Sequence, residues 1–309
     1  MASFFWLYRP TAPSARAQSI QVIHTAHAMA ARGHDVTLCV EALASEAPGE
    51  ILDFYGLDEL PTFHLKVSRR GRTAASLAFR AQFLRWVRRT KGRGVVVARS
   101  KRYALEAARI LGKRFRLIIE AHEVDSLLAI EGGADPTEFR RQEAQVFALA
   151  DGVVANCEGT LELIQESYPL ACPSVVLHNG THNTWTSRST PGPRGTADSP
   201  GDGVGYVGSV RQQKDLGTLA AAAVKLDLPV TVVGVDEGSL GPLIKASAGH
   251  LSVEPPIPYK DVPDRLARFR VLVLPLSPGL FGEKLTSPIK LWDYMASGVP
   301  IVAADLPSL

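Results

Sequence analysis

Short apolar segments alternate with segments of helical periodicity along most of the chain. Near the N-terminus, an apolar run at 4–8 is followed by a loop rich in proline and serine and by a helical pattern at 18–32. Gly33 ends this helix, and residues 36–40 form a second apolar run. This order predicts a strand, a helix and a parallel strand, a βαβ unit whose ligands bind at the carboxyl ends of the strands.

The same alternation continues toward the C-terminus. Further strands, some with the turn that follows them, are predicted at 95–99, 116–121, 151–158, 174–177, 204–207, 229–233, 251–255, 271–276 and 299–304. Most of the segments between them have the apolar spacing of helices. Strands that alternate with helices are typical of α/β domains with parallel sheets.

Residues 184–203 interrupt this pattern. They are rich in Ser, Thr, Pro and Gly and have no apolar periodicity, which favours a linker. We therefore predict two α/β domains, at 1–183 and 204–309, with a cleft between them.

Composition limits the classes of protein that fit. With 309 residues, 46% of them hydrophobic, the chain is long enough for two globular domains. The net charge of +3, from 34 basic and 31 acidic residues, does not favour a nucleic-acid-binding protein. Three cysteines without a CxxC pair, Cys39, Cys157 and Cys172, indicate free thiols in a reducing compartment. No apolar run reaches the roughly 18 residues of a membrane span, and the N-terminal one is too short for a signal peptide, so we expect a cytoplasmic protein.

The basic residues are unevenly distributed. Ten Lys or Arg and no acid lie at 66–93, and within this range 73–89 predicts an amphipathic helix. One interpretation is a surface helix that packs on a sheet with its basic face in solvent. The alternative is weak peripheral contact with an anionic membrane at its cytoplasmic face.

Residues 286–304 predict a helix followed by a strand. We expect the hydroxyl of Thr286 or Ser287 to cap the helix, with Pro288 in its first turn. Gly298 ends the helix in a left-handed conformation, and 299–304 form a fully buried parallel strand. The predicted buried stripe of the helix consists of Leu291, Trp292 and Met295.

The start of this helix is a candidate anion site. The amides of the turn Ser287, Pro288 and Ile289, together with the positive end of the helix dipole, attract anions, of which phosphate is the commonest. Asp293 lies about one and a half turns later, where its carboxylate would accept hydrogen bonds from ribose hydroxyls. The alternative is an ordinary helix–strand unit without a ligand.

The run from Ser287 to Ala303 resembles a family signature. Its sequence, Ser-Pro-Ile-Lys-Leu-Trp-Asp-Tyr-Met-Ala-Ser-Gly-Val-Pro-Ile-Val-Ala, is similar nearly position for position to the nucleotide-sugar motif of retaining glycosyltransferases of the GT-B fold, family four. Shorter likenesses to the same family lie at 33–36, 120–123 and 179–182, and 206–214 is again closely similar. The resemblance implies two Rossmann-like domains and transfer of a sugar from a nucleotide diphosphate to an acceptor hydroxyl.

The resemblance also implies roles in the second half of the chain. Lys214 would bind the diphosphate of the donor, and its charge suits a leaving group that gains negative charge. Many relatives carry Arg where this chain has Ser209, and Arg211 would substitute for it. Pro258 and Tyr259 lie where relatives hold the nucleotide base, and an aromatic ring there can stack on a base.

Three further residues are candidates through the resemblance. His122 would lie near the donor sugar, although a histidine after a strand is otherwise a structural residue. Arg16, in the loop after the first strand, would contact a phosphate or the acceptor, with a plain surface role as the alternative. The family often carries two glutamates eight residues apart; Asp293 stands at the second place, Leu285 at the first, and Glu283 would serve instead.

The mechanism implied by the family retains the anomeric configuration and uses neither a metal nor a cofactor. The expected partners are a nucleotide sugar and a hydroxyl acceptor, which is a glycan, a lipid-linked molecule or a small molecule in polysaccharide or glycoconjugate biosynthesis. Relatives continue with a further helix–strand segment and a final helix beyond the position of Leu309. We therefore expect the second domain to be incomplete.

Two other functions fit the same pattern. A nucleotide-sugar epimerase needs acids and a histidine at one sugar, and Glu120, His122 and Glu123 would supply them. A non-catalytic two-domain sugar-binding protein would bind sugar without turnover or nucleotide dependence. A new nucleotide sugar made from donor alone would identify the epimerase.

Overall fold

The structure consists of two compact units. The computed structural model describes residues 3–7, 11–42, 46–69, 81–85, 88–89, 93–182, 203–210, 214–235, 238 and 240–309. The first unit contains Met1–Ser14, Gln18–His178 and Lys284–Thr286; the second contains Ala15–Ala17, Asn179–Glu283 and Ser287–Leu309. Apart from Gly203, the predicted linker at 184–203 lies outside the described residues.

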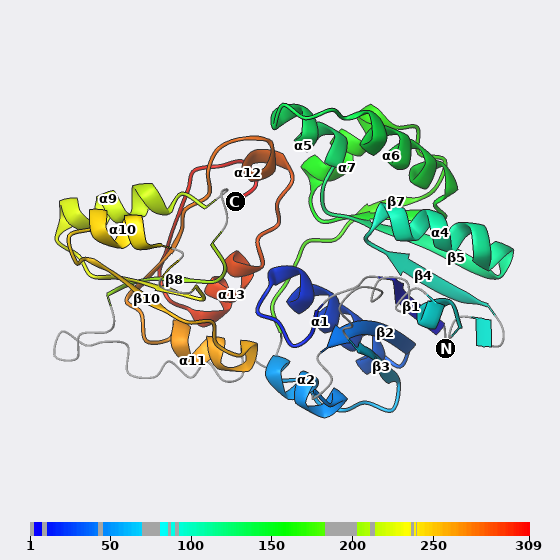
Figure 1. Ribbon diagram of the computed structural model, residues 1–309, viewed down its shortest axis with the longest axis horizontal. Coiled ribbons are helices and arrows are strands. Elements are labelled where there is room, and N and C mark those ends of the chain that lie inside the picture. The colour runs from blue at the N-terminus through cyan, green and yellow to red at the C-terminus, as the bar shows by residue number, and fades with distance from the viewer. Residues whose placement is uncertain are drawn as a thin grey trace. The chain divides into compact units, whose positions relative to one another are not determined.

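The first unit is built on a parallel sheet of seven strands in the order β3-β2-β1-β4-β5-β6-β7 (Figure 1). The strands are β1 (Ser3–Leu7), β2 (Asp35–Ala42), β3 (Phe63–Arg69), β4 (Gly94–Ala98), β5 (Phe115–Ala121), β6 (Gly152–Ala155) and β7 (Ser174–Val176). The helices are α1 (Ala17–Ala31), α2 (Pro48–Tyr55), α4 (Lys101–Leu111), η1 (Gly112–Arg114), α5 (Asp125–Glu131), α6 (Thr137–Leu149) and α7 (Glu158–Ser167).

The sequence of the central strands explains this arrangement. In β2 all residues after Asp35 are buried, as expected for a parallel strand covered on both faces. Helix α1 buries Val22, Ile23 and Ala26, which recur at helical spacing. The strand order changes direction between β1 and β4, so the loop after β4 lies where ligands of such folds bind, and the loop after β5 lies beside it at the same carboxyl edge.

The second unit has a parallel sheet of five strands in the order β10-β9-β8-β11-β12. The strands are β8 (Val204–Val207), β9 (Val230–Val233), β10 (Leu251–Glu254), β11 (Val271–Leu274) and β12 (Ile301–Ala303). The helices are α9 (Leu216–Leu226), α10 (Gly241–Ala246), η3 (Tyr259–Asp261), α11 (Val262–Leu266), α12 (Leu280–Lys284) and α13 (Ile289–Ser297). Helices α9 and α10 cover one face of the sheet, and α11 and α13 lie on the other (Figure 1).

The core of the second unit forms mainly between the strands and α9. Tyr206, Leu216, Val232 and Leu251 are among its buried members. The strand order changes direction between β8 and β11. The loops after these two strands therefore meet at the carboxyl edge of the sheet, which is where doubly wound sheets bind their ligands.

Helix α13 differs from the sequence prediction in two ways. Its N-cap residue is Pro288, which has no side-chain acceptor, so neither Thr286 nor Ser287 caps it. Its buried residues are Ile289, Asp293 and Tyr294, whereas Met295, predicted to be buried, is 57% exposed. Helical spacing identifies residues that share a face, but the neighbouring elements decide which face they cover. Gly298 does end the helix in the left-handed region, with φ 70°.

The strand after α13 was predicted to be fully buried, and this prediction is wrong. β12 is parallel to β11 but lies at the edge of the sheet, paired on one side within the described chain. Val302 is 60% exposed as a result.

The expectations for the basic helix and for the cysteines can be compared with the structure only in part. The predicted basic helix at 73–89 lies mostly outside the described residues, since only 81–85 and 88–89 are described there. All three cysteines are free thiols. Across the described parts of the chain, every helix is too short or too polar to cross a bilayer.

Candidate functional site

Lys214 lies at the carboxyl edge of the second sheet. Its backbone forms an isolated antiparallel bridge with Leu276, and the neighbouring Asp215 amide donates to the Pro275 carbonyl (2.9 Å). These contacts join the loop after β8 to the loop after β11, the two strands at which the strand order changes direction. The half-buried ammonium lies 6.0 Å from the ring centroid of Phe281. The sheet therefore holds a lysine where a doubly wound fold binds its ligand.

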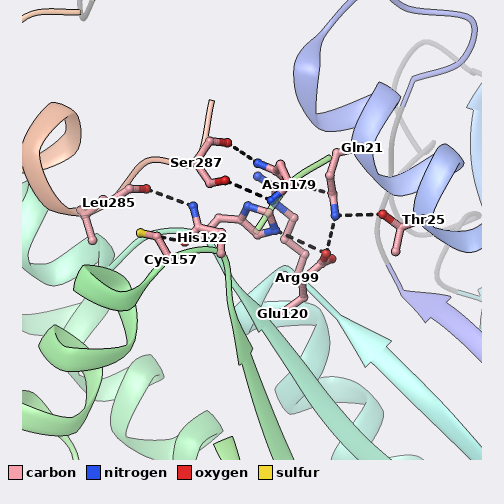
Figure 2. Close-up of polar contacts among 10 residues, drawn as sticks. Gln21, Thr25, Arg99, Glu120, His122, Cys157, Asn179, Leu285 and Ser287 are labelled. Carbon is pink, nitrogen blue, oxygen red and sulfur yellow. Dashed lines mark hydrogen bonds and ion pairs between the residues drawn. The ribbon is translucent and has the colours of Figure 1, made fainter. Parts of the chain in front are cut away.

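The turn that opens α13 is fixed by Asn179. The Asn179 backbone N–H donates to the Ser287 hydroxyl (3.0 Å), and the Asn179 side-chain amide donates to the Ser287 carbonyl (Figure 2). The Ser287 hydroxyl also accepts from the Trp292 ring nitrogen (3.4 Å). Because this hydroxyl is turned toward Asn179 and Trp292, it leaves the helix amides uncapped. The Leu291 amide donates to the Pro288 carbonyl (3.0 Å), and the Ile289 amide has no acceptor in the described part of the chain.

Asp293 lies on the buried side of α13. It is 5% exposed, and its Oδ1 accepts a hydrogen bond from the Tyr259 hydroxyl (2.9 Å). Burial raises the pKa of Asp293 to about 7, although the hydroxyls of Thr181 and Tyr259 and the charge of Lys290 oppose the rise. The Thr181 hydroxyl is near enough to have this effect but forms no hydrogen bond of normal geometry with the described residues. Near neutral pH the carboxyl is thus only about half ionised.

Asp293→Asn is expected to remove a pH dependence of stability between about pH 4 and pH 7. Because the pKa of Asp293 in the folded protein exceeds its ordinary value of 3.8, the folded state keeps a proton that the unfolded chain releases in this range. Stability therefore falls as pH rises through the range, by roughly 4 kcal/mol at the upper limit. Asparagine stays neutral and still accepts from Tyr259.

Urea unfolding of the wild type and the variant at several pH values measures this difference. Asp264→Asn, at an exposed position of α11, is the matched control and should keep the slope of the wild type. An unchanged slope in Asp293→Asn would show that this carboxyl does not cause the dependence.

Tyr259 supports Asp293 in this structure. The tyrosine is 4% exposed, so its ring has little free surface for a base, and its hydroxyl holds the carboxyl. Base stacking by Tyr259 stays a prediction. Pro258, the residue before it, is half-buried.

His122 belongs to a polar cluster at the carboxyl edge of the first sheet (Figure 2). Its Nε2 lies 3.4 Å from Oε1 of Glu120, the same oxygen that accepts from the Gln21 side chain (2.6 Å). The Arg99 guanidinium in turn donates to the Gln21 side-chain oxygen (3.2 Å). The cluster therefore joins β5 and the loop after β4 to helix α1.

The pKa values of Glu120 and His122 are both lowered in this cluster. Burial would raise the pKa of Glu120, but the contact with His122, the charge of Arg99 and the hydrogen bond from Gln21 together lower it to about 2. Burial lowers the pKa of His122, partly offset by Glu120. The Glu120 Oε2 atom is buried and has no hydrogen bond within the described residues. An ionised carboxylate beside a neutral histidine is a suitable group to bind a hydroxyl.

Asn156 and Cys157 fix the segment Lys284–Thr286 to the first unit. The Asn156 side chain donates to the Leu285 carbonyl (3.1 Å), and the Cys157 thiol donates to the Lys284 carbonyl (3.2 Å). Leu285 is buried. The position where relatives often carry an acid is therefore an apolar anchor in this chain.

The remaining candidates are less constrained. The Ser209 carbonyl accepts from the Tyr206 hydroxyl (2.9 Å), which places Ser209 in the turn after β8. Glu283, exposed on α12, accepts from the Gly279 amide (3.3 Å). Arg16 is exposed and lies in the short segment Ala15–Ala17, which belongs to the second unit. Arg211 lies outside the described residues. Among the described residues, no group of His, Cys, Asp and Glu is placed to hold a metal ion.

Sequence reasoning missed several members of these clusters. Gln21 and Arg99 meet Glu120 only through the fold, and no local pattern marks them. Lys290 lies within the motif Ser287–Ala303, but the sequence analysis assigned it no role.

Two family models match the chain and together cover most of it. The model described as glycosyl transferase 4-like domain matches residues 17–180, and the model described as glycosyl transferases group 1 matches 201–309. The chain belongs to the glycosyl transferase 4-like family. No curated protein matches the sequence.

Solved structures with the same fold support this assignment. Sucrose-phosphate synthase from Thermosynechococcus elongatus superposes with a TM-score of 0.76 at 13% identity over 99% of this chain and 82% of that one. Anabaena HepE in complex with UDP-glucose gives 0.65 at 14% identity, over 100% and 82%. WaaG, a glycosyltransferase involved in lipopolysaccharide biosynthesis, gives 0.64 at 13% identity, over 99% and 82%. The prediction of two parallel-sheet domains of the GT-B fold is confirmed.

Proposed function

We propose that this glycosyltransferase moves a sugar from a nucleotide diphosphate to an acceptor hydroxyl, with retention and without a catalytic metal. The observation that carries the proposal is the edge of the second sheet, where Lys214 bridges the loops after β8 and β11. An ammonium group at this place suits a diphosphate whose negative charge increases as it leaves.

The opening turn of α13 supports the same donor site. Its Ile289 amide has no acceptor among the described residues, and amides at a helix start bind phosphate well. Asp293 would accept from a ribose hydroxyl through the oxygen that Tyr259 does not occupy. HepE, one of the similar structures, was solved with UDP-glucose, so UDP is the first nucleotide to test.

The reaction breaks the bond between the anomeric carbon and the oxygen of the β-phosphate. A new bond forms between that carbon and the acceptor oxygen on the same face of the sugar, through an oxocarbenium-like transition state. The proton of the acceptor hydroxyl passes to the departing phosphate. The products are the glycoside and the nucleoside diphosphate, so no oxidant or added base is needed.

The cluster around His122 in the first unit would bind hydroxyls of the sugar or acceptor. Its ionised Glu120 and neutral His122 accept hydrogen bonds at neutral pH.

A thermal-shift screen of UDP, GDP, ADP, CDP and dTDP tests the donor site. One nucleoside diphosphate is expected to raise the midpoint, because a ligand that binds only the folded state stabilises it by about 2.7 kcal/mol at one hundred times its Kd. The matching nucleotide sugars are then incubated with and without simple glycosides, and the products are identified by mass spectrometry and NMR.

The outcomes separate the candidate functions. A glycoside with the anomeric configuration of the donor supports the proposal, and one with the inverted configuration contradicts retention. A new nucleotide sugar from the donor alone would indicate an epimerase. If none of the five diphosphates shifts the midpoint, the donor site is wrong.

A further inference from the structure

Lys290 places a positive charge in the first turn of α13. That turn, all of it described, contains no acidic residue. Helix N-termini favour acids because of their partial positive charge, so a lysine in the first turn is electrostatically unfavourable there. Asp293, on the next turn, is only about half ionised near neutral pH. The protein therefore concentrates positive potential at this end of the helix.

The Lys290 side chain lies across Gly208, the residue that follows β8. A methyl group built on Gly208 would lie 2.0 Å from Cε of the lysine and 2.7 Å from its Nζ. The ammonium also lies 5.4 Å from the ring centroid of the buried Tyr206. A side chain at Gly208 would therefore clash with the lysine in its present position, and the φ of 137° at Gly208 independently favours glycine.

This path brings the ammonium to the carboxyl edge of the sheet. Gly208 directly follows β8, so the lysine that lies across it ends at the carboxyl end of that strand. The same edge carries Lys214, held by its bridge to Leu276. Two lysines from different elements thus lie at the edge where the strand order changes direction.

We propose that Lys290 is a ligand of the donor diphosphate, and that its side chain reaches the phosphates across Gly208. The proposal rests on the proposed function and extends its donor site by one cation. The second cation of the donor site is then Lys290 of α13, whereas the sequence analysis had expected Arg211. An ammonium group binds phosphate as a charge-assisted donor, so its contribution depends on the diphosphate and not on the base.

Calorimetric titration of the full chain with UDP, GDP and ADP and with uridine, guanosine and adenosine tests this. Lys290→Gln is expected to raise the Kd of the diphosphate that binds the wild type by at least about tenfold, as expected for a lost charged hydrogen bond. The Kd of the matching nucleoside should stay within about twofold. Lys290→Arg should keep most of the diphosphate affinity.

Lys225→Gln is the matched control, since Lys225 is exposed in the last turn of α9 in the same unit. It should bind both probes like the wild type. A second neutral variant, Lys290→Met, guards against a misfolded glutamine variant, and the midpoint without nucleotide reports folding for each.

The outcomes distinguish this proposal from the one on which it rests. If the wild type binds none of the diphosphates, the donor site itself is wrong and Lys290 has no phosphate to bind. If the wild type binds one and the neutral variants bind it equally well, only the role of Lys290 is overturned. If the neutral variants lose diphosphate and nucleoside affinity equally, the lysine shapes the site without contacting phosphate.

Discussion

Lys214→Ala is expected to lower kcat for sugar transfer by about 100- to 1000-fold, the usual loss when one preorganised electrostatic donor is removed. In the proposed mechanism the ammonium acts mainly in the transition state, where the leaving diphosphate gains charge. KM for the nucleotide sugar should therefore change less than kcat. The fold should persist, because the contacts that hold this segment are made by the backbones of Lys214 and Asp215.

Steady-state rates with the nucleotide sugar identified in the screen measure this effect. Lys245→Ala, at an exposed position of α10, removes the same charge from the same unit and should leave kcat unchanged. Lys214→Arg should be intermediate, since it keeps the charge in a different shape. Equal rates for Lys214→Ala and the wild type would remove Lys214 from the reaction.

The fold could be predicted because its signals are local. Apolar runs separated by helical patterns indicated two parallel-sheet domains, and the structure confirms this class. Helix α2 and strand β3 were not predicted, and the strand at 299–304 was wrongly expected to be fully buried. Burial on both faces depends on a neighbour on each side, and a single segment of sequence does not report its neighbours.

In the candidate site, too, only the residues with a local sequence signal could be predicted. Lys214 and the turn at Ser287 were identified as candidates through local motifs that resemble a family. Gln21 and Arg99 were missed because their only signal is their meeting with Glu120 in three dimensions. Asp293 was found, but its burial under Tyr259 was not, because the face of α13 that is buried depends on elements far away in the chain.

A buried ion pair in the first unit is the clearest case of such distant pairing. The Lys101 ammonium lies 2.5 Å from Asp125 Oδ2 and 2.9 Å from Glu143 Oε1, and Glu143 is 0% exposed. The Tyr168 hydroxyl donates to the other Glu143 oxygen (2.6 Å), and the Asp125 amide donates to Oε1 (2.7 Å). Four segments thus meet at the Glu143 carboxylate. They are the starts of α4 and α5, the middle of α6 and the end of α7.

Lys101→Met is expected to destabilise the protein by about 3–5 kcal/mol, because it leaves the charge of Glu143 buried without its cation. Burial would raise the pKa of Glu143, but Lys101 and the hydroxyls of Ser126 and Tyr168 lower it overall. A lowered pKa contributes stability above the ordinary value of 4.5, and this contribution is lost as pH falls through the pKa of the folded state. The loss caused by Lys101→Met should therefore be largest near neutral pH and smaller in acid.

The double variant Lys101→Met, Glu143→Leu separates the ion pair from the cost of an unpaired charge. It should be more stable than Lys101→Met alone, since two apolar side chains leave no buried charge behind. Urea unfolding measures the difference, and hydrogen exchange of amides in α4 and α6 assigns it to the first unit. Additive losses in the double variant would mean that the two charges do not interact, and that the meeting of four segments depends on packing alone.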